Sequence, residues 1–265
     1  MDLIQAFENV LVNPREMAVL WLGQAGFLIK DCKGKKAVID PYLTDSVERL
    51  SGYKRLMMPI VSPDALDVDI YLCTHAHDDH LDVDAAPEIM KNPETILIGP
   101  SSVTSICRSL GIVTERMVEV EMGQACQIGD YIVTAVYADH GDLEPCAVGF
   151  VVENGGVTLY FTGDTAYRPE QMAAAFKMHP DVVILPINGE FGNLNAEEAA
   201  LVARDCGAKA AIPSHFWTLA VHRGDPFEFG EKMKELAPEC RANYLCQGEF
   251  AIFHANLEGK RGELA

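Results

Sequence analysis

An apolar run leads directly into an H-x-H-x-D-H motif at residues 71–82, which read YLCTHAHDDHLD. Three imidazoles and a carboxylate are rarely crowded together in a folded protein unless they are hydrogen-bonded or bind a cation. His75 and His77 lie two residues apart at a strand end, so both side chains project to the same side and can share one ion. Asp79 and His80, past the following turn, can reach a second ion. Because imidazole and carboxylate ligands suit zinc, manganese and iron, the motif predicts a metal site at the end of a strand.

The rest of the chain alternates short apolar runs with turns and amphipathic segments. This pattern predicts strands at 18–22, 27–30, 37–39, 69–73, 95–99, 117–121, 124–128, 131–138, 147–153, 157–162, 182–186, 210–213 and 249–253. It predicts helices at 83–91, 102–110, 169–177, 196–206 and 227–236, and an irregular loop over one edge at 45–66. Two strand-rich blocks, each followed by helices, indicate two packed sheets with helices outside. We therefore expect an α/β fold, a four-layer αββα sandwich formed by one domain over residues 1–265.

Three further ligand-capable side chains follow predicted strands. His140 comes after the strand at 131–138, Asp164 follows the apolar run 157–162, and His215 follows 210–213. Each is a weak signal alone, because a histidine after a strand is usually not a metal ligand. On one rim of a sandwich, however, the three would complete the coordination of two ions begun by the first motif.

The order of these motifs resembles the metallo-β-lactamase superfamily, from about residue 19 to residue 253. The closer likeness is to the ascorbate-6-phosphate lactonase family and its compact metal-dependent hydrolase relatives. It is carried by WLGQAG at 21–26, IDP at 39–41, residues 74–82, IGP at 98–100, GDT at 163–165, LPING at 185–189 and IPSHFW at 212–217. The chain lacks long insertions that we associate with the lactonase and has a clear histidine at 140, and both features resemble the compact relatives.

The resemblance implies a role for each matching residue. It implies that one ion is held by His75, His77 and His140, that the other is held by Asp79, His80 and His215, and that Asp164 bridges both. The ions would be two divalent metals, zinc or manganese, with iron also compatible with the ligands. Asp40 would hydrogen-bond a ligand and fix its orientation, or would simply be a turn residue before Pro41.

This ligand set predicts hydrolysis of a small, potentially anionic molecule, a lactone or related ester, by a metal-bridging hydroxide. Asp79 would be a catalytic residue that orients the hydroxide or passes its proton to the leaving group. Asn188 and Phe191, in the loop after 182–186, could line the pocket or form a plain turn. Phe216 and Trp217 could form an apolar wall or pack in the core. Arg168 and Arg223 could bind a substrate phosphate or carboxylate, or form surface ion pairs.

Charge and composition limit the partners. The net charge of −18 repels phosphate backbones and no basic stripe offsets it, so we expect a small-molecule substrate and no nucleic acid. No run of about 18 apolar residues is present, and the first residues read as a short amphipathic helix rather than a signal peptide. We expect a cytoplasmic protein that does not bind a membrane. A homo-oligomer is compatible with the sequence, because symmetric assembly is common.

Three alternative functions remain at this stage. A phosphodiesterase acting on a small or lipid phosphodiester would use the same ligands. A di-iron redox protein would typically carry Glu where this chain has His77, and would need a flavodoxin partner. A non-catalytic binding module would be expected to have lost ligands, whereas every expected ligand position is filled here.

Overall fold

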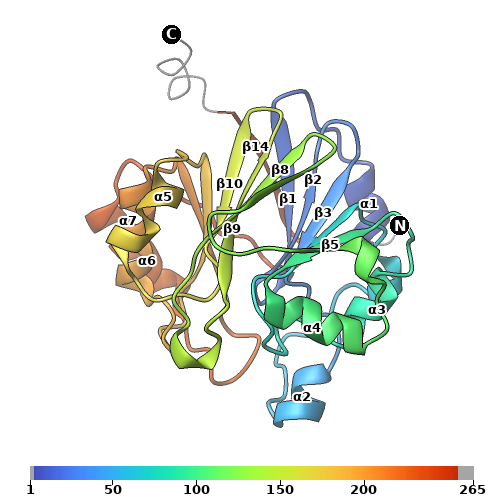
Figure 1. Ribbon diagram of the computed structural model, residues 1–265. Helices are drawn as coiled ribbons and strands as arrows, with labels where there is room; N and C mark the ends of the chain where they lie inside the picture. The colour runs from blue at the N-terminus through green and yellow to red at the C-terminus, as the bar shows by residue number, and fades with distance from the viewer. Residues whose placement is uncertain (1–2, 256–265) are drawn as a thin grey trace.

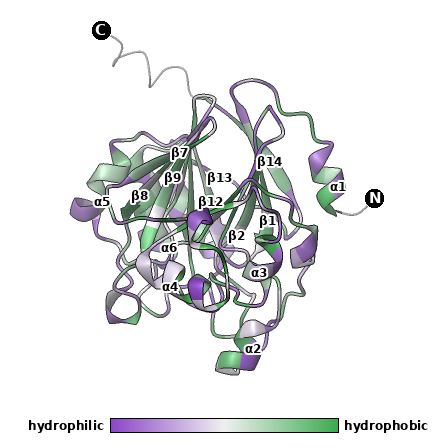
Figure 2. Cartoon of the chain, turned by 45° about the vertical axis from the view of Figure 1, so that its right-hand side comes forward, coloured by the Kyte–Doolittle hydropathy of each residue, from purple (hydrophilic) through white to green (hydrophobic). Residues whose placement is uncertain are grey.

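Two seven-stranded sheets pack face to face, with helices on both outer surfaces (Figure 1). The computed structural model describes residues 3–255. Helices α1, α3 and α4 cover the first sheet and α5, α6 and α7 cover the second, so the predicted four-layer αββα sandwich is confirmed. The strands are predominantly hydrophobic, as Figure 2 shows, because both faces of each sheet are covered.

The first sheet has the strand order β14-β1-β2-β3-β4-β5-β6. Its strands are β1 (Glu16–Gly23), β2 (Gly26–Lys30), β3 (Lys36–Ile39), β4 (Ile70–Leu72), β5 (Ile96–Gly99), β6 (Met117–Glu119) and β14 (Phe250–His254). The second sheet has the order β13-β12-β11-β10-β9-β8-β7. Its strands are β7 (Ala125–Ile128), β8 (Tyr131–Tyr137), β9 (Val148–Asn154), β10 (Val157–Phe161), β11 (Val182–Pro186), β12 (Ala210–Ser214) and β13 (Arg241–Ala242).

The helices lie between the strands in sequence and outside them in space. They are α1 (Leu3–Glu8), α2 (Ser46–Ser51), α3 (Ala85–Ile89), α4 (Ser101–Ser109), α5 (Pro169–Phe176), α6 (Ala196–Cys206) and α7 (Pro226–Leu236). Three 3-10 turns are η1 (Pro63–Ala65), η2 (Thr114–Arg116) and η3 (Gly141–Leu143). No helix of residues 3–255 is both long and apolar enough to cross a bilayer.

The side chains of strand β1 contribute alternately to two hydrophobic cores. Met17, Val19 and Trp21 face the core between the sheets. Ala18 and Leu20 face the core beneath α1 and α3. Since successive side chains of a strand point to opposite faces, an unbroken apolar strand can fill both cores.

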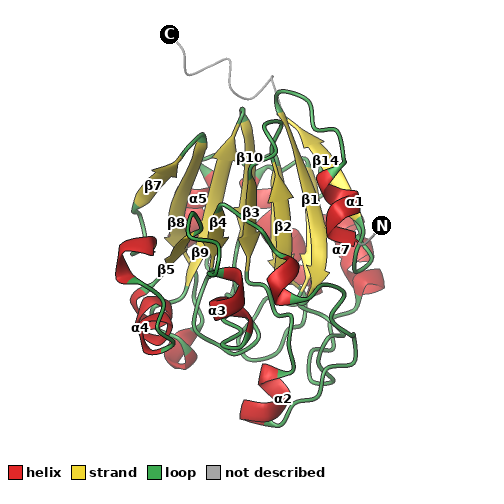
Figure 3. Cartoon of the chain, turned by 90° about the vertical axis from the view of Figure 1, so that its right-hand side faces the viewer, coloured by secondary structure: helices red, strands yellow, loops and turns green. Residues whose placement is uncertain are grey.

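The strands that carry the predicted ligands end at one edge of the sandwich. In the first sheet β3 and β4 run parallel; in the second sheet β10, β11 and β12 run parallel. The two sheets are joined at this edge, because the Val148 amide donates to the Thr74 carbonyl and the His215 amide donates to the Gln24 carbonyl. Figure 3 shows the loops gathered at this end of the strands, with α2 beyond them.

The segment 45–66 is more regular than the sequence indicated. It contains α2 and η1, where an irregular loop was predicted, so that prediction was wrong for these residues. Helix α2 is capped by Gly52, which adopts the left-handed conformation with φ of 76°. A six-residue helix bounded by a glycine is too short to show a clear apolar period. The structure also adds the two-residue strand β13, which no apolar run marks.

We predict that replacing Gly149 on β9 with alanine destabilises the fold. The added Cβ would lie 2.8 Å from the carbonyl oxygens of Phe161 and Thr162, which are backbone atoms that cannot move aside. Overpacking of this kind costs about 1–3 kcal/mol in the free energy of unfolding. Urea denaturation followed by circular dichroism measures the change.

The matched control is Gly129→Asn in the turn between β7 and β8. Gly129 has φ of 60°, which asparagine tolerates, and nothing lies within 4 Å of an added Cβ. We expect a change within about 0.5 kcal/mol at this site. Equal losses in the two variants would contradict the packing argument.

Candidate metal centre

The turn after β4 brings the first four predicted ligands together. The amides of His80 and Leu81 both donate to the His77 carbonyl, at 2.9 and 2.8 Å, which folds the segment back on itself. Asp82 anchors the turn, because its carboxylate accepts hydrogen bonds from the amides of Leu43 and Thr44 at 2.9 and 2.7 Å. The ligand turn is therefore held by main-chain contacts to the loop after β3.

Three ring nitrogens converge at the first position. Nδ1 of His77 lies 3.1 Å from Nε2 of His75 and 3.2 Å from Nε2 of His140. One nitrogen cannot satisfy both neighbours with a single proton. A shared cation would satisfy all three, so this arrangement fits a metal ion better than a hydrogen-bond network.

A second group faces the first across Asp164. Nε2 of His80 lies 3.2 Å from Nε2 of His215, which lies 3.2 Å from Oδ2 of Asp79. The Asp164 carboxylate lies 3.4 Å from His80, 3.3 Å from His215 and 3.9 Å from His140. All seven residues named by the motifs thus meet at one place, and Asp164 lies between the two groups.

Neighbouring groups and burial shift the pKa values of the side chains in the cluster. Burial alone would raise the pKa of Asp164, but the imidazoles of His215 and His80 outweigh it and hold this pKa well below its usual range. The same imidazoles depress the pKa of Asp79 against its burial. Burial, together with the proximity of His80, holds the pKa of His75 well below its usual range. The Asp164, Asp40 and Asp79 carboxylates raise the pKa of His80 despite its burial, so a cation bound there would displace the proton of this ring.

Asp40 supports the ligands from the loop after β3. Its Oδ2 lies 2.8 Å from Nδ1 of His80 and accepts a hydrogen bond from the Thr74 hydroxyl at 2.6 Å. Its Oδ1 accepts from the Thr74 amide at 2.8 Å. The contact to Nδ1 directs Nε2 of His80 toward the cluster. Of the two interpretations of Asp40, the geometry favours the orienting role.

Three residues outside the predicted set of site residues contact this cluster. Nδ2 of Asn193 donates to Oδ2 of Asp164 at 2.7 Å. Nε2 of Gln24 donates to Oδ2 of Asp79 at 2.7 Å and lies 2.8 Å from Nδ1 of His222. Gln24 is part of the WLGQAG segment. The two glycines around this polar residue were the one feature of the sequence that pointed to a special role for Gln24.

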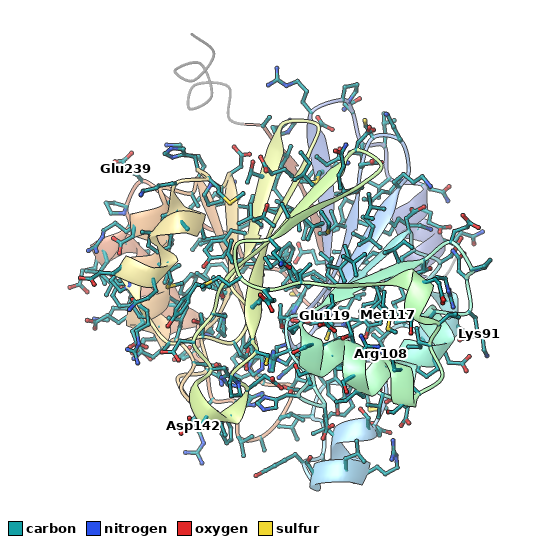
Figure 4. The ribbon with its side chains drawn as sticks, in the orientation of Figure 1. Lys91, Arg108, Met117, Glu119, Asp142 and Glu239 are labelled. Atoms are coloured by element: carbon teal, nitrogen blue, oxygen red, sulfur yellow. The ribbon has the colours of Figure 1, made fainter. Side chains whose placement is uncertain are left out.

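A cavity of about 240 Å³ opens onto the cluster. It reaches His77, Asp79, His140, Asp164 and His215, and its remaining walls come mainly from the α2 region, η3, Phe191 and the loop at 219–222. Phe191 therefore lies where a pocket-lining role requires. Figure 4 shows Asp142 of η3 at the same end of the molecule as α2.

The other predicted substrate residues lie elsewhere. Asn188 accepts a hydrogen bond from Nδ2 of Asn193, at 3.2 Å, and so lies behind Asp164. Phe216 and Trp217 line a separate apolar cavity with Tyr244 and other residues. Arg168 pairs with Asp139 at 2.8 Å. Neither Arg168 nor the exposed Arg223 lines the cavity at the cluster, although His222, directly before Arg223, does.

Comparisons with known proteins agree with this geometry. A family model described as a beta-lactamase superfamily domain matches residues 18–215. A UPF0173 metal-dependent hydrolase of Polynucleobacter asymbioticus is 31% identical over 237 residues, covering 82% of this chain and 80% of that protein. Two solved structures share the fold over 90% of this chain and 99% of theirs. They are Igni18, a metallo hydrolase of Ignicoccus hospitalis (TM-score 0.75, 22% identity), and an isothiocyanate hydrolase from Delia radicum gut bacteria (TM-score 0.73, 20% identity).

We predict that Asp40→Asn weakens metal binding without unfolding the chain. Asparagine tolerates the positive φ of 44° at this position, but it cannot accept both the Thr74 and His80 hydrogen bonds as a carboxylate does. Loss of such a supporting contact lowers metal affinity about 10- to 100-fold. Competition with a chromophoric zinc chelator measures the affinity.

Asp84→Asn is the control, since Asp84 is exposed at the start of α3 and its carboxylate pairs with Arg49. Its zinc affinity should equal that of the unmodified chain. If Asp40→Asn also kept that affinity within about twofold, Asp40 would be only a turn residue.

Proposed function

Because this chain belongs to the metallo-β-lactamase superfamily, and within it to the UPF0173 metal-dependent hydrolases, we propose that it hydrolyses a small ester or lactone at two divalent metal ions, zinc or manganese. The single observation that carries this proposal is the position of Asp164 between two groups of three ligands. His75, His77 and His140 would hold one ion; Asp79, His80 and His215 would hold the other. Asp164 would contact both.

The side chains at the cluster would have separate roles in the reaction. Divalent cations, when bound, lower the pKa of water and polarise the electrophilic oxygen of an ester. Asp79 lines the cavity, so its carboxylate is available to orient the attacking water and to accept its proton. Gln24 holds that carboxylate through one oxygen, which limits its rotation. Asp40 and Asn193 hold His80 and Asp164 in the same way.

The walls of the cavity indicate the class of substrate. Val47, Leu143, Phe191, Leu219 and Val221 contribute apolar surface. No lysine or arginine among residues 3–255 lines this cavity. An anionic group on the substrate, away from the bond that is cut, would therefore lose its hydration without gaining a lysine or arginine partner.

Arg55, a buried cation that follows α2 in sequence, is bonded to other groups. Arg55 is buried behind α2, where its guanidinium donates to the carbonyls of Tyr42, Thr44 and Met57 at 2.8–3.1 Å. It also stacks on the Tyr42 ring at 4.2 Å. Because these donors bond to backbone carbonyls, Arg55 supports the loop at 42–44 and does not face the substrate. We infer a substrate that is neutral and carries a short apolar substituent.

We predict that the chain binds two equivalents of zinc or manganese and that Asp164→Ala loses both metal and esterase activity. Removal of the shared carboxylate leaves three ligands in each group. It also removes the negative charge that would lie between the two cations. Elemental analysis after dialysis gives the stoichiometry, and release of 4-nitrophenol from 4-nitrophenyl hexanoate gives the activity. Asp142→Ala is the matched control, because Asp142 is exposed on η3 beside the cavity. Full turnover by Asp164→Ala would contradict the two-metal proposal.

A second prediction concerns the charge of the substrate. The kcat/KM for 4-nitrophenyl hexanoate should exceed that for the mono-4-nitrophenyl ester of adipic acid by about tenfold or more. The two esters match in length and leaving group, and burial of the unpaired terminal carboxylate costs at least about 1 kcal/mol. Preference for the adipate ester would contradict the neutral class. Activity confined to bis(4-nitrophenyl) phosphate in the same panel would instead indicate a phosphodiesterase.

A further inference from the structure

Gln24 is held rigidly at the junction of the two sheets. Its backbone amide donates to the Thr218 hydroxyl at 3.1 Å. Its carbonyl accepts from the Trp21 indole at 3.0 Å and from the His215 amide at 3.1 Å. The side chain is fully buried, so its position relative to the cluster is fixed by both neighbouring loops.

The orientation of the Gln24 amide group follows from its neighbours. The amide nitrogen lies 2.7 Å from an Asp79 oxygen, which can only accept a hydrogen bond when ionised. Exchange of the amide oxygen and nitrogen would place two oxygens in contact, so the NH₂ group must face Asp79. The second hydrogen of this NH₂ group then faces Nδ1 of His222, 2.8 Å away.

This contact determines which nitrogen of His222 carries the proton. Since Nδ1 accepts from Gln24, the hydrogen of the neutral ring lies on Nε2. Nε2 makes no hydrogen bond to any of residues 3–255. It is also not one of the completely buried polar atoms that lack a partner in that part of the chain, so it remains accessible. The ring lines the cavity, 4.3 Å from the His215 ring and 6.0 Å from the Phe191 ring. A single N–H donor is thus presented to the cavity beside the predicted ligands.

We propose that His222 donates a hydrogen bond from Nε2 to the substrate oxygen that gains negative charge during hydrolysis. This inference rests on the proposed function, because it requires an ester in the cavity. Val47, Leu143, Phe191, Leu219 and Val221 give this cavity apolar walls, so the donor would act in a partly desolvated site, where a hydrogen bond to charge is stronger than in water. Gln24 would be a positioning residue that couples this donor to Asp79 through one amide group.

A packing role for the same ring makes a different prediction. His222 stacks beside His215, so its removal could disturb a metal ligand without any contact to substrate. Three substitutions separate the two roles. His222→Gln can place an amide N–H near the position of Nε2, His222→Asn can replace only Nδ1, and His222→Phe keeps the ring but has no donor. A packing role ranks Phe above Gln, and a donor role ranks Gln above Phe and Asn.

The experiment uses the metal-loaded chain with 4-nitrophenyl hexanoate as substrate and methyl pentylphosphonate as an anionic analogue of the tetrahedral state. We expect His222→Phe and His222→Asn to lose kcat by about a hundredfold, with KM changed little, as for loss of one donor to an oxyanion. Calorimetric titration should show a similar loss of affinity for the phosphonate. His222→Gln should recover most of both, and zinc content should be the same in all variants. His254→Phe, at an exposed histidine of β14, controls for the substitution itself.

Each other outcome has a definite meaning. If His222→Phe kept the kcat and phosphonate affinity of the unmodified chain, or if Gln failed to exceed Phe, the donor role would be overturned. Loss of zinc in all three His222 variants would also overturn it and would assign a packing role. If the unmodified chain cleaved no ester, the proposed function would fail, and the phosphonate titration would still decide whether Nε2 binds an anionic oxygen.

Discussion

The buried contact of Asp164 with histidines from both sheets is the interaction on which this architecture depends. His80 follows β4 of the first sheet and His215 follows β12 of the second, and the carboxylate lies within 3.4 Å of both. A buried carboxylate is costly unless it is paired, and several facing imidazoles are costly unless a cation or a proton lies between them. The cluster therefore stabilises the sandwich only when both sheets deliver their loops to the same edge. The backbone hydrogen bond from Val148 to Thr74 fixes the meeting point of the two sheets.

Much of this arrangement could be predicted from the sequence because it depends on local patterns. Apolar runs gave the strands, except the two-residue β13, and the H-x-H-x-D-H motif follows β4 directly. The ligand-capable residues Asp164 and His215 follow the parallel strands β10 and β12, and His140 follows the antiparallel strand β8 of the same sheet. The structure places all seven predicted ligands within one cluster, although only metal analysis can test their role.

The substrate side of the site could not be predicted in the same way, because its contacts depend on how loops pack. Arg168 looked available in an acidic chain, but Asp139, which is 29 residues away, holds it. Phe216 and Trp217 follow a ligand in sequence, yet they turn to the opposite side of the loop and line another cavity. His222 belongs to no recognised motif, and among residues 3–255 the hydrogen-bond partner of its ring is Gln24, 198 residues away. Long-range contacts of single side chains leave no period in the sequence.

Backbone strain is concentrated in the loops around the cluster. Gln24, Asp40, Phe191, His215 and Trp217 all have positive φ, between 44° and 61°, and they are five of the seven non-glycine residues in residues 3–255 that do. Such conformations cost about 1 kcal/mol or more for each residue, and glycine would relieve the cost. At three of these positions glycine would also remove a side chain that binds or supports the cluster: Gln24, Asp40 and His215. The strain at Gln24, Asp40 and His215 persists because these buried side chains bind or support the cluster. A regular turn at Gln24 would leave Asp79 and His222 without their common partner, so the least regular backbone of the fold is also the part that joins the metal cluster to the substrate cavity.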